Sequence, residues 1–125
     1  MEKVTGIGGY FFKAKDPQKL AEWYFKYMGI SKTPTTYEES SWWQDRGPTI
    51  FEPFDHTNPY LNKYERHWII NFRVKNLDAM VQQLTNAEIE VEVDPQIYPN
   101  GRFAMLDDPE GNPIQLWEPA GIDTL

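Results

Sequence analysis

Few side chains in this sequence could act as metal ligands or as acids and bases. There are 2 histidines, His56 and His67, and no cysteine. Histidine is a common metal ligand and general base, so these two residues, with Glu52 and Glu118, are the candidates for such chemistry. The absence of cysteine excludes thiolate metal sites, thiol nucleophiles and disulfides. A metal-dependent reaction that uses these four scattered residues stays open as an alternative.

Nucleophilic and phosphate-binding chemistry have no support in the sequence. The serine pair at 40–41 has no neighbouring histidine and aspartate to activate it. The glycine-rich stretch 6–9 precedes an expected strand and not a helix, so it does not form a phosphate loop. The aspartates at 107–108 lie in an expected turn, which does not favour a catalytic pair.

The first half of the chain is expected to begin with a strand followed by a helix. Residues 10–15 predict the strand. Asp16 is a good N-cap residue, and Pro17 suits the first helical position. The helix should cover residues 17–28 and end at Gly29, because glycine readily takes the left-handed conformation.

The second half repeats this pattern. Residues 68–75 predict a strand, and Asn76 should cap a helix over 77–87. The segments 12–16 (FKAKD) and 72–76 (FRVKN) align without a gap, and 50–53 (IFEP) resembles 116–119 (LWEP). The sequence therefore predicts one strand–helix–strands unit used twice.

Further strands are expected after each helix. In the first half they are residues 35–37, 41–44 and 49–52, and in the second half 88–93, 102–106 and 113–117. The turn-forming residues 107–112 should join the last two strands into a hairpin. The whole chain, 1–125, is interpreted as a single domain with a module at 4–53, a linker at 54–66 and a module at 67–119.

Strand alternation selects the residues that face away from the helices. Successive side chains of a strand point to opposite faces, and the mostly apolar set should lie beneath the helices. The other set mixes aromatic rings with polar groups: Phe11, Thr49, Phe51, Asn71, Arg73, Gln115 and Trp117. An apolar wall with a few polar groups is typical of a small-molecule pocket, so these are the predicted ligand-binding residues. Arg73 could pair with an anion, and either Trp42 or Trp43 could cover a planar ligand.

Several motifs are similar to those of a known family. They are Asp16 with Trp23-Tyr24 and Met28-Gly29, residues 72–79 (FRVKNLDA) and residues 107–116 (DDPEGNPIQL). On these motifs the chain resembles the glyoxalase/bleomycin-resistance/dioxygenase superfamily, also called vicinal oxygen chelate proteins, over residues 5–119. The resemblance implies an α+β, glyoxalase-like fold in which two βαβββ modules form curved mixed sheets around a cleft, usually completed in a homodimer.

The resemblance also implies where a metal would bind. Enzymes of the family use His or Gln, Glu, His and Glu at four equivalent strand positions, which here correspond to Gly9, Thr49, Ile69 and Gln115. Divalent metals in such sites need imidazole or carboxylate donors, and only Gln115 offers even a weak carbonyl oxygen. We therefore expect no metal at these positions and no cofactor.

The end of the second helix also departs from the family. Relatives usually have glycine where this chain has Glu88. We expect Asn86 to take the left-handed conformation in its place.

Charge and composition restrict the possible partners. A chain of 125 residues with a formal net charge of −7 would be repelled by the phosphates of nucleic acids. It has no apolar run long enough for a membrane span, and its first residues lack the apolar stretch of a signal peptide. We expect a cytoplasmic protein with no nucleic acid or membrane partner.

The leading hypothesis is a homodimeric protein that binds a small organic molecule without the family's metal, as the antibiotic-binding branch of the family suggests. Whether it is an enzyme stays open. One alternative is a metal-dependent lyase, dioxygenase or isomerase with non-standard ligands. Another is a non-catalytic interaction module whose aromatic residues serve only partner contacts.

Overall fold

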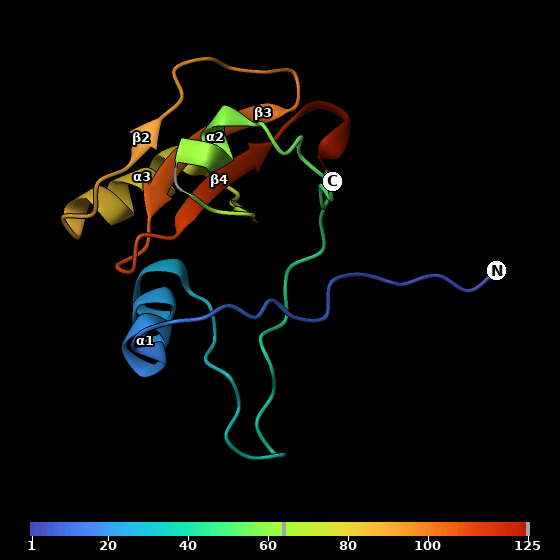
Figure 1. Ribbon diagram of the computed structural model, residues 1–125, viewed down its shortest axis with the longest axis vertical. Helices are drawn as coiled ribbons and strands as arrows, with labels where there is room; N and C mark the ends of the chain where they lie inside the picture. The colour runs from blue at the N-terminus through green and yellow to red at the C-terminus, as the bar shows by residue number, and fades with distance from the viewer. Residues whose placement is uncertain (64, 125) are drawn as a thin grey trace.

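The protein is described by a computed structural model over residues 1–63 and 65–124. In chain order the elements are α1 (Pro17–Met28), α2 (Pro59–Lys63), β1 (Ile70–Arg73), α3 (Leu77–Asn86), β2 (Glu92–Val93), β3 (Gly101–Asp107), β4 (Pro113–Pro119) and a 3-10 turn, η1 (Gly121–Asp123). The sheet has the order β1-β4-β3-β2, with β1 parallel to β4 and the other pairs antiparallel. This mixed sheet with helices confirms the predicted α+β class (Figure 1).

Both long helices begin as the sequence predicts. Asp16 accepts a hydrogen bond from the backbone N–H of Lys19 at 3.0 Å at the start of α1. Asn76 accepts one from the N–H of Ala79 at 2.9 Å at the start of α3. Gly29 ends α1 with φ 72°, the left-handed conformation that glycine adopts at little cost.

The end of α3 differs from the prediction. Asn86 stays inside the helix, and Glu88 takes the left-handed conformation with φ 62°. The reason is that the N–H groups of Ala87 and Glu88 still bond to carbonyls of the last turn, at 3.0 Å each. The chain therefore reverses two residues later than expected.

The hydrophobic core lies between the two helices and one face of the sheet. It consists of Leu20, Tyr24, Leu77, Leu84, Ala104, Leu106, Ile114 and Leu116. Ile114 and Leu116 are fully buried on the helix side, as strand alternation predicts. Phe72 and Val74 of the β1 region pack against the same cluster.

The first half of the chain contributes a helix but no strand. The predicted strands at 10–15, 35–37, 41–44 and 49–52 are without strand pairing in the structure. Figure 1 shows the segments before and after α1 running away from the sheet. A strand needs a hydrogen-bonded neighbour, and these segments have none among the described residues.

The strands of the second half form, with shifted ends. The expected strand at 68–75 pairs only over Ile70–Arg73, and that at 88–93 only over Glu92–Val93. β3 and β4 are each longer than expected and pair along their whole length, from Gly101 with Pro119 to Asp107 with Pro113. The predicted hairpin is therefore confirmed.

The expected linker, 54–66, contains the short helix α2. Asn58 caps this helix by accepting from the N–H of Tyr60 at 2.9 Å. The Tyr60 hydroxyl reaches the sulfur of Met105 at 3.6 Å. Because the neighbours of Met105 in β3 are core residues, α2 lies on the sheet face opposite to α1 and α3. The division into modules at 4–53 and 67–119 stays a prediction.

Candidate functional site

Two of the predicted site residues meet on the sheet face that lies opposite to the long helices. Asn71 of β1 is paired in register with Gln115 of β4. The Asn71 amide nitrogen donates to the Gln115 amide oxygen at 2.7 Å. This bond leaves the second amide hydrogen of Asn71 and the amide nitrogen of Gln115 for other partners.

Trp117 lies next to them and is closed off from solvent. Its side chain is 1% exposed, its ring stacks on that of Phe103 at a centroid distance of 6.3 Å, and its indole nitrogen donates to the carbonyl of Asn100 at 2.9 Å. Gly101 makes this packing possible, since a Cβ there would lie 2.8 Å from the indole nitrogen. Trp117 therefore supports the sheet face from within an aromatic cluster.

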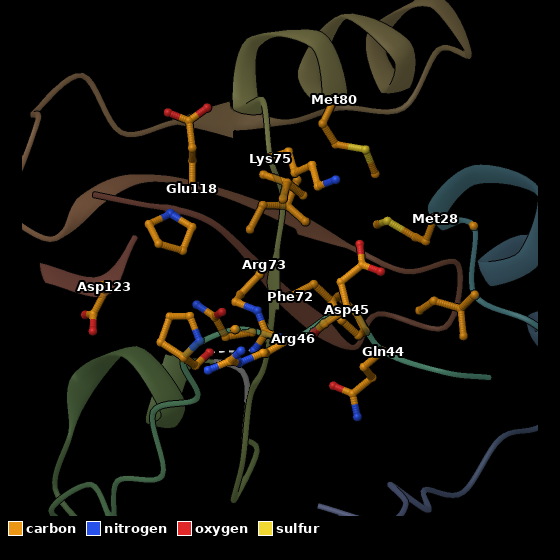
Figure 2. A pocket seen from close by; sticks show the side chains of 18 of the residues that line it. Met28, Gln44, Asp45, Arg46, Phe72, Arg73, Lys75, Met80, Glu118 and Asp123 are labelled. Atoms are coloured by element: carbon orange, nitrogen blue, oxygen red, sulfur yellow. Dashed lines mark hydrogen bonds between the residues drawn. The ribbon is translucent and has the colours of Figure 1, made fainter. Parts of the chain in front are cut away.

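Arg73 and Thr49 are also brought together. One terminal nitrogen of Arg73, Nη1, donates to the carbonyl of Pro48 and to the Thr49 hydroxyl, the latter at 3.3 Å. The other, Nη2, donates to the carbonyl of Asp45 at 2.8 Å. Figure 2 shows the Arg73 side chain reaching toward the loop that carries Asp45 and Arg46. The guanidinium thus connects the edge of the sheet to residues 45–49.

A cavity of about 770 Å³ lies along the open edge of β1, within the range of small-molecule sites. Asn71 and Arg73 line it from the sheet, and Trp42 and Trp43 line it from the loop. It is an open hollow at the side of the sheet, where β1 has no further strand beside it among residues 1–63 and 65–124.

Sequence reasoning missed part of this lining. Met28, Met80 and Arg46 also line the cavity (Figure 2). The two methionines lie on the apolar faces of α1 and α3 and also pack against the hydrophobic core. Their helical spacing gave no sign of a cavity, because a core contact and a cavity wall use the same residue types.

The aromatic residues Phe11 and Phe51 are not part of this arrangement. Their side chains are 93% and 87% exposed, in extended segments of the first half. The structure therefore pairs Asn71 with Gln115 and Arg73 with Thr49, but of the predicted residues only Asn71 and Arg73 line the cavity. Thr49, Gln115 and Trp117 lie outside its lining, and the two phenylalanine rings are uncovered.

The residues at the family's metal positions do not fit a metal. The side chains of Gly9 and Ile69 have no donor atom. The Thr49 hydroxyl accepts from Arg73, and the Gln115 oxygen accepts from Asn71, so both possible donors are engaged by cationic or amide N–H groups. Such a donor set lacks the imidazole and carboxylate groups that divalent metals select.

The alternative metal ligands do not form a cluster. His56 and His67 are exposed, and His56 lies 3.6 Å from its neighbour Asp55. Glu118 accepts from the backbone N–H of Leu77 at 2.8 Å, so it caps α3 on the helix side. Over residues 1–63 and 65–124, no three His, Asp or Glu side chains gather as a metal site would require.

One buried carboxylate has a structural role. Asp108, 4% exposed, accepts from the Tyr24 hydroxyl at 2.7 Å and from the backbone N–H groups of Glu110 and Asn112 at 2.8 and 3.0 Å. The pKa of the Tyr24 phenol is raised well above its ordinary value. Burial is the largest cause, and the hydrogen bond to Asp108 is the next. Asp108 thereby fixes the β3–β4 turn and ties it to α1.

The fold and the lateral cavity define a small α+β protein with a mixed sheet and an aromatic, methionine-lined hollow. Residues 6–116 match the Glyoxalase/Bleomycin resistance protein/Dioxygenase superfamily, and the chain belongs to this family. No curated protein matches the sequence significantly. No helix in the described part of the chain is long and apolar enough to cross a membrane.

Solved structures show the same fold at low sequence identity. TnmS3, an antibiotic binding protein from Streptomyces sp. CB03234, is 18% identical, with a TM-score of 0.60 over 96% of this chain and 100% of its own. A protein described as a glyoxalase family member from Bacillus anthracis is 21% identical, with a TM-score of 0.51 over 82% of this chain and 83% of its own. At these identities the likeness shows the fold alone.

Proposed function

We propose that this protein binds a small organic molecule, with an aromatic or otherwise planar part, in the cavity beside β1. The observation that carries the proposal is the lining itself. Trp42 and Trp43 offer flat apolar surface, and Met28 and Met80 offer polarisable, adaptable surface. The described function of TnmS3, antibiotic binding, supports a small organic ligand.

The polar end of the proposed site is Asn71, the member of the amide pair that lines the cavity. Asn71 and Gln115 fix each other's orientation through their 2.7 Å hydrogen bond and keep free donors for a ligand. Arg73 and Thr49 contribute at the loop side, and Trp117 holds the strand beneath them. Binding at this site requires no metal in our proposal, since the family's metal positions carry no suitable donors.

We also propose that the protein acts as a homodimer. The first half leaves large apolar side chains uncovered, among them Val4 at 90%, Phe11 at 93%, Trp43 at 84% and Phe51 at 87% exposure. Exposed apolar surface of this extent favours a partner. A second copy that covers it would bring Phe11 and Phe51 into the ligand-binding wall. The proposed compartment is the cytoplasm. Its reducing conditions prevent disulfides, and a chain without cysteine does not depend on them.

The test begins with a screen of planar aromatic compounds, including aromatic antibiotics, by thermal shift and calorimetry. Asn71→Ala should weaken the best compound about tenfold, because it removes a hydrogen-bonded amide from the wall. The control is Asn86→Ala, which breaks a similar amide pair, Gln82 with Asn86 at 2.8 Å, on the exposed side of α3.

Three results would contradict the proposal. They are the absence of any bound compound in the screen, equal affinities of Asn71→Ala and wild type, and loss of binding on removal of a stoichiometric metal. Light scattering during size exclusion tests the dimer separately, and a monomer at all concentrations would overturn that part.

A further inference from the structure

The open edge of β1 is closed by a side chain and not by a strand. β1 is the last strand of the sheet, and the N–H of Val74, just after it, bonds to the carbonyl of Trp117 at 2.9 Å. Because strand residues alternate, the backbone groups of Asn71 and Arg73 point away from β4. An exposed strand edge is usually covered or blocked, and here the loop at 45–49 lies beside it.

Three of the five N–H groups of the Arg73 guanidinium bond to this loop. Its three hydrogen bonds go to the carbonyls of Asp45 and Pro48 and to the Thr49 hydroxyl. Its Nε side is covered by Gly47, where an added Cβ would lie 2.5 Å from Nε. Most of the guanidinium is therefore used to hold the loop, and two N–H groups stay outside these bonds.

The loop has no other hydrogen-bonded anchor in the part of the chain that the structure describes. All hydrogen bonds to residues 42–49 come from Arg73. Gly47 and Pro48 are half-buried, and the other residues of this stretch are exposed. Trp42 and Trp43 lie just before the anchored residues, with only Gln44 between, and line the cavity.

We infer that Arg73 is a positioning residue that holds the loop at residues 45–49 on the β1 edge and so places Trp42 and Trp43 in the cavity wall. The consequence for ligand binding rests on the proposed function. The positioning itself does not, because it is a property of the ligand-free protein.

The experiment labels the protein with 5-fluorotryptophan and records fluorine NMR spectra without ligand. Trp42→Phe and Trp43→Phe assign the two loop signals. Arg73→Met should shift or broaden both of them and leave the signal of Trp23 in place, whereas Trp117 is no control because it pairs with Arg73 across the strands. Arg73→Lys should restore them only in part, because one ammonium cannot replace a planar group that holds three acceptors.

Gly47→Ala provides an independent variant that keeps the arginine. Its Cβ would meet Arg73 at Nε, Cζ and Cδ, at 2.5, 3.0 and 3.1 Å, so the middle of the side chain must move away. We expect the same changes in the Trp42 and Trp43 signals as in Arg73→Met. The matched control is Arg102→Met, whose guanidinium on β3 bonds to Asp78 at 3.0 Å, outside this loop.

The outcomes separate the two proposals. Unchanged Trp42 and Trp43 signals in Arg73→Met and Gly47→Ala would overturn the positioning role. With a compound from the screen, Gly47→Ala should bind at least fivefold more weakly than wild type. Wild-type affinity in Gly47→Ala beside lost affinity in Arg73→Met would make Arg73 a direct ligand contact and overturn the inference. If no compound binds, the proposed function fails while the ligand-free spectra still decide the role of Arg73.

Discussion

The two halves of this chain share a pattern of apolar residues, but the corresponding side chains are buried to very different extents. Leu116 of β4 is fully buried, whereas its counterpart Ile50 is 54% exposed. Trp117 is 1% exposed, and its counterpart Phe51 is 87% exposed. The alternation of apolar residues therefore fixes which side chains share a face, but a neighbouring strand must be present before that face is buried.

The turns explain why one half pairs and the other does not. In the second half, Asp108 is buried and accepts backbone hydrogen bonds that hold the β3–β4 hairpin in one register. The corresponding turn of the first half, residues 46–48 (RGP), has no such carboxylate and is held from outside by Arg73. A hairpin turn brings two strands that are close in sequence side by side. A strand that is not part of a hairpin depends on a partner that is distant in sequence.

The largest expected effect compares Leu116→Ala with Ile50→Ala. Leu116→Ala should lower the free energy of unfolding by about 3 kcal/mol, because it opens a cavity in the core. Ile50→Ala should cost less than about 0.5 kcal/mol in dilute protein, where the side chain stays largely exposed. Urea denaturation of both variants at low protein concentration measures the difference.

Protein concentration sharpens this comparison. If a second copy covers the first half, the cost of Ile50→Ala should grow as the concentration rises, whereas that of Leu116→Ala should not. Equal losses at the lowest concentration would mean that the first half packs within one chain as well as the second does, which would break the contrast.

The next effect concerns the contact between α1 and the hairpin. Tyr24→Phe removes the hydroxyl that donates to buried Asp108 and should cost about 1.5 kcal/mol at neutral pH. The pKa of Tyr24 is raised in the folded state, so this contribution is complete below the ordinary tyrosine pKa of about 10 and is lost as the pH rises above it. The advantage of wild type over Tyr24→Phe should therefore shrink in alkaline solution.

Urea denaturation of both proteins from neutral to alkaline pH provides the measurement. The control is Tyr27→Phe on the same helix, since among the described residues Tyr27 accepts a side-chain hydrogen bond at its carbonyl and its hydroxyl makes none. A constant difference between wild type and Tyr24→Phe over the whole range would show that α1 is not tied to the second half through this phenol.

The sequence predicts the second half better than the first for a physical reason. The caps at Asp16 and Asn76 and the hairpin turn are local interactions, so their residues identify them directly. The pairing of Asn71 with Gln115 follows from alternation once β1 and β4 are adjacent. The position of the 45–49 loop depends on one long side chain, Arg73, and no periodicity in the sequence indicates where such a side chain reaches.

The smallest expected effects concern the ends of the two helices, where different residues take the left-handed conformation. α1 ends at Gly29 with φ 72°, and α3 is followed by Glu88 with φ 62°. Gly29→Ala should cost about 1 kcal/mol because a Cβ is unfavourable in the left-handed conformation. Apart from the adjoining residues of the chain, no atom lies within 4 Å of the position that this Cβ would take, so the cost is a backbone effect.

Glu88→Gly should act in the opposite direction and stabilise the protein by about 0.5 kcal/mol, since relief of the left-handed strain exceeds the added freedom of the unfolded chain. Ala87→Gly is the control one residue earlier, where φ is −89° and glycine brings no relief, so it should destabilise. Thermal unfolding of the three variants gives the comparison. A loss of stability in Glu88→Gly equal to that in Ala87→Gly would show that the end of α3 is not strained and that the two helices end equally well.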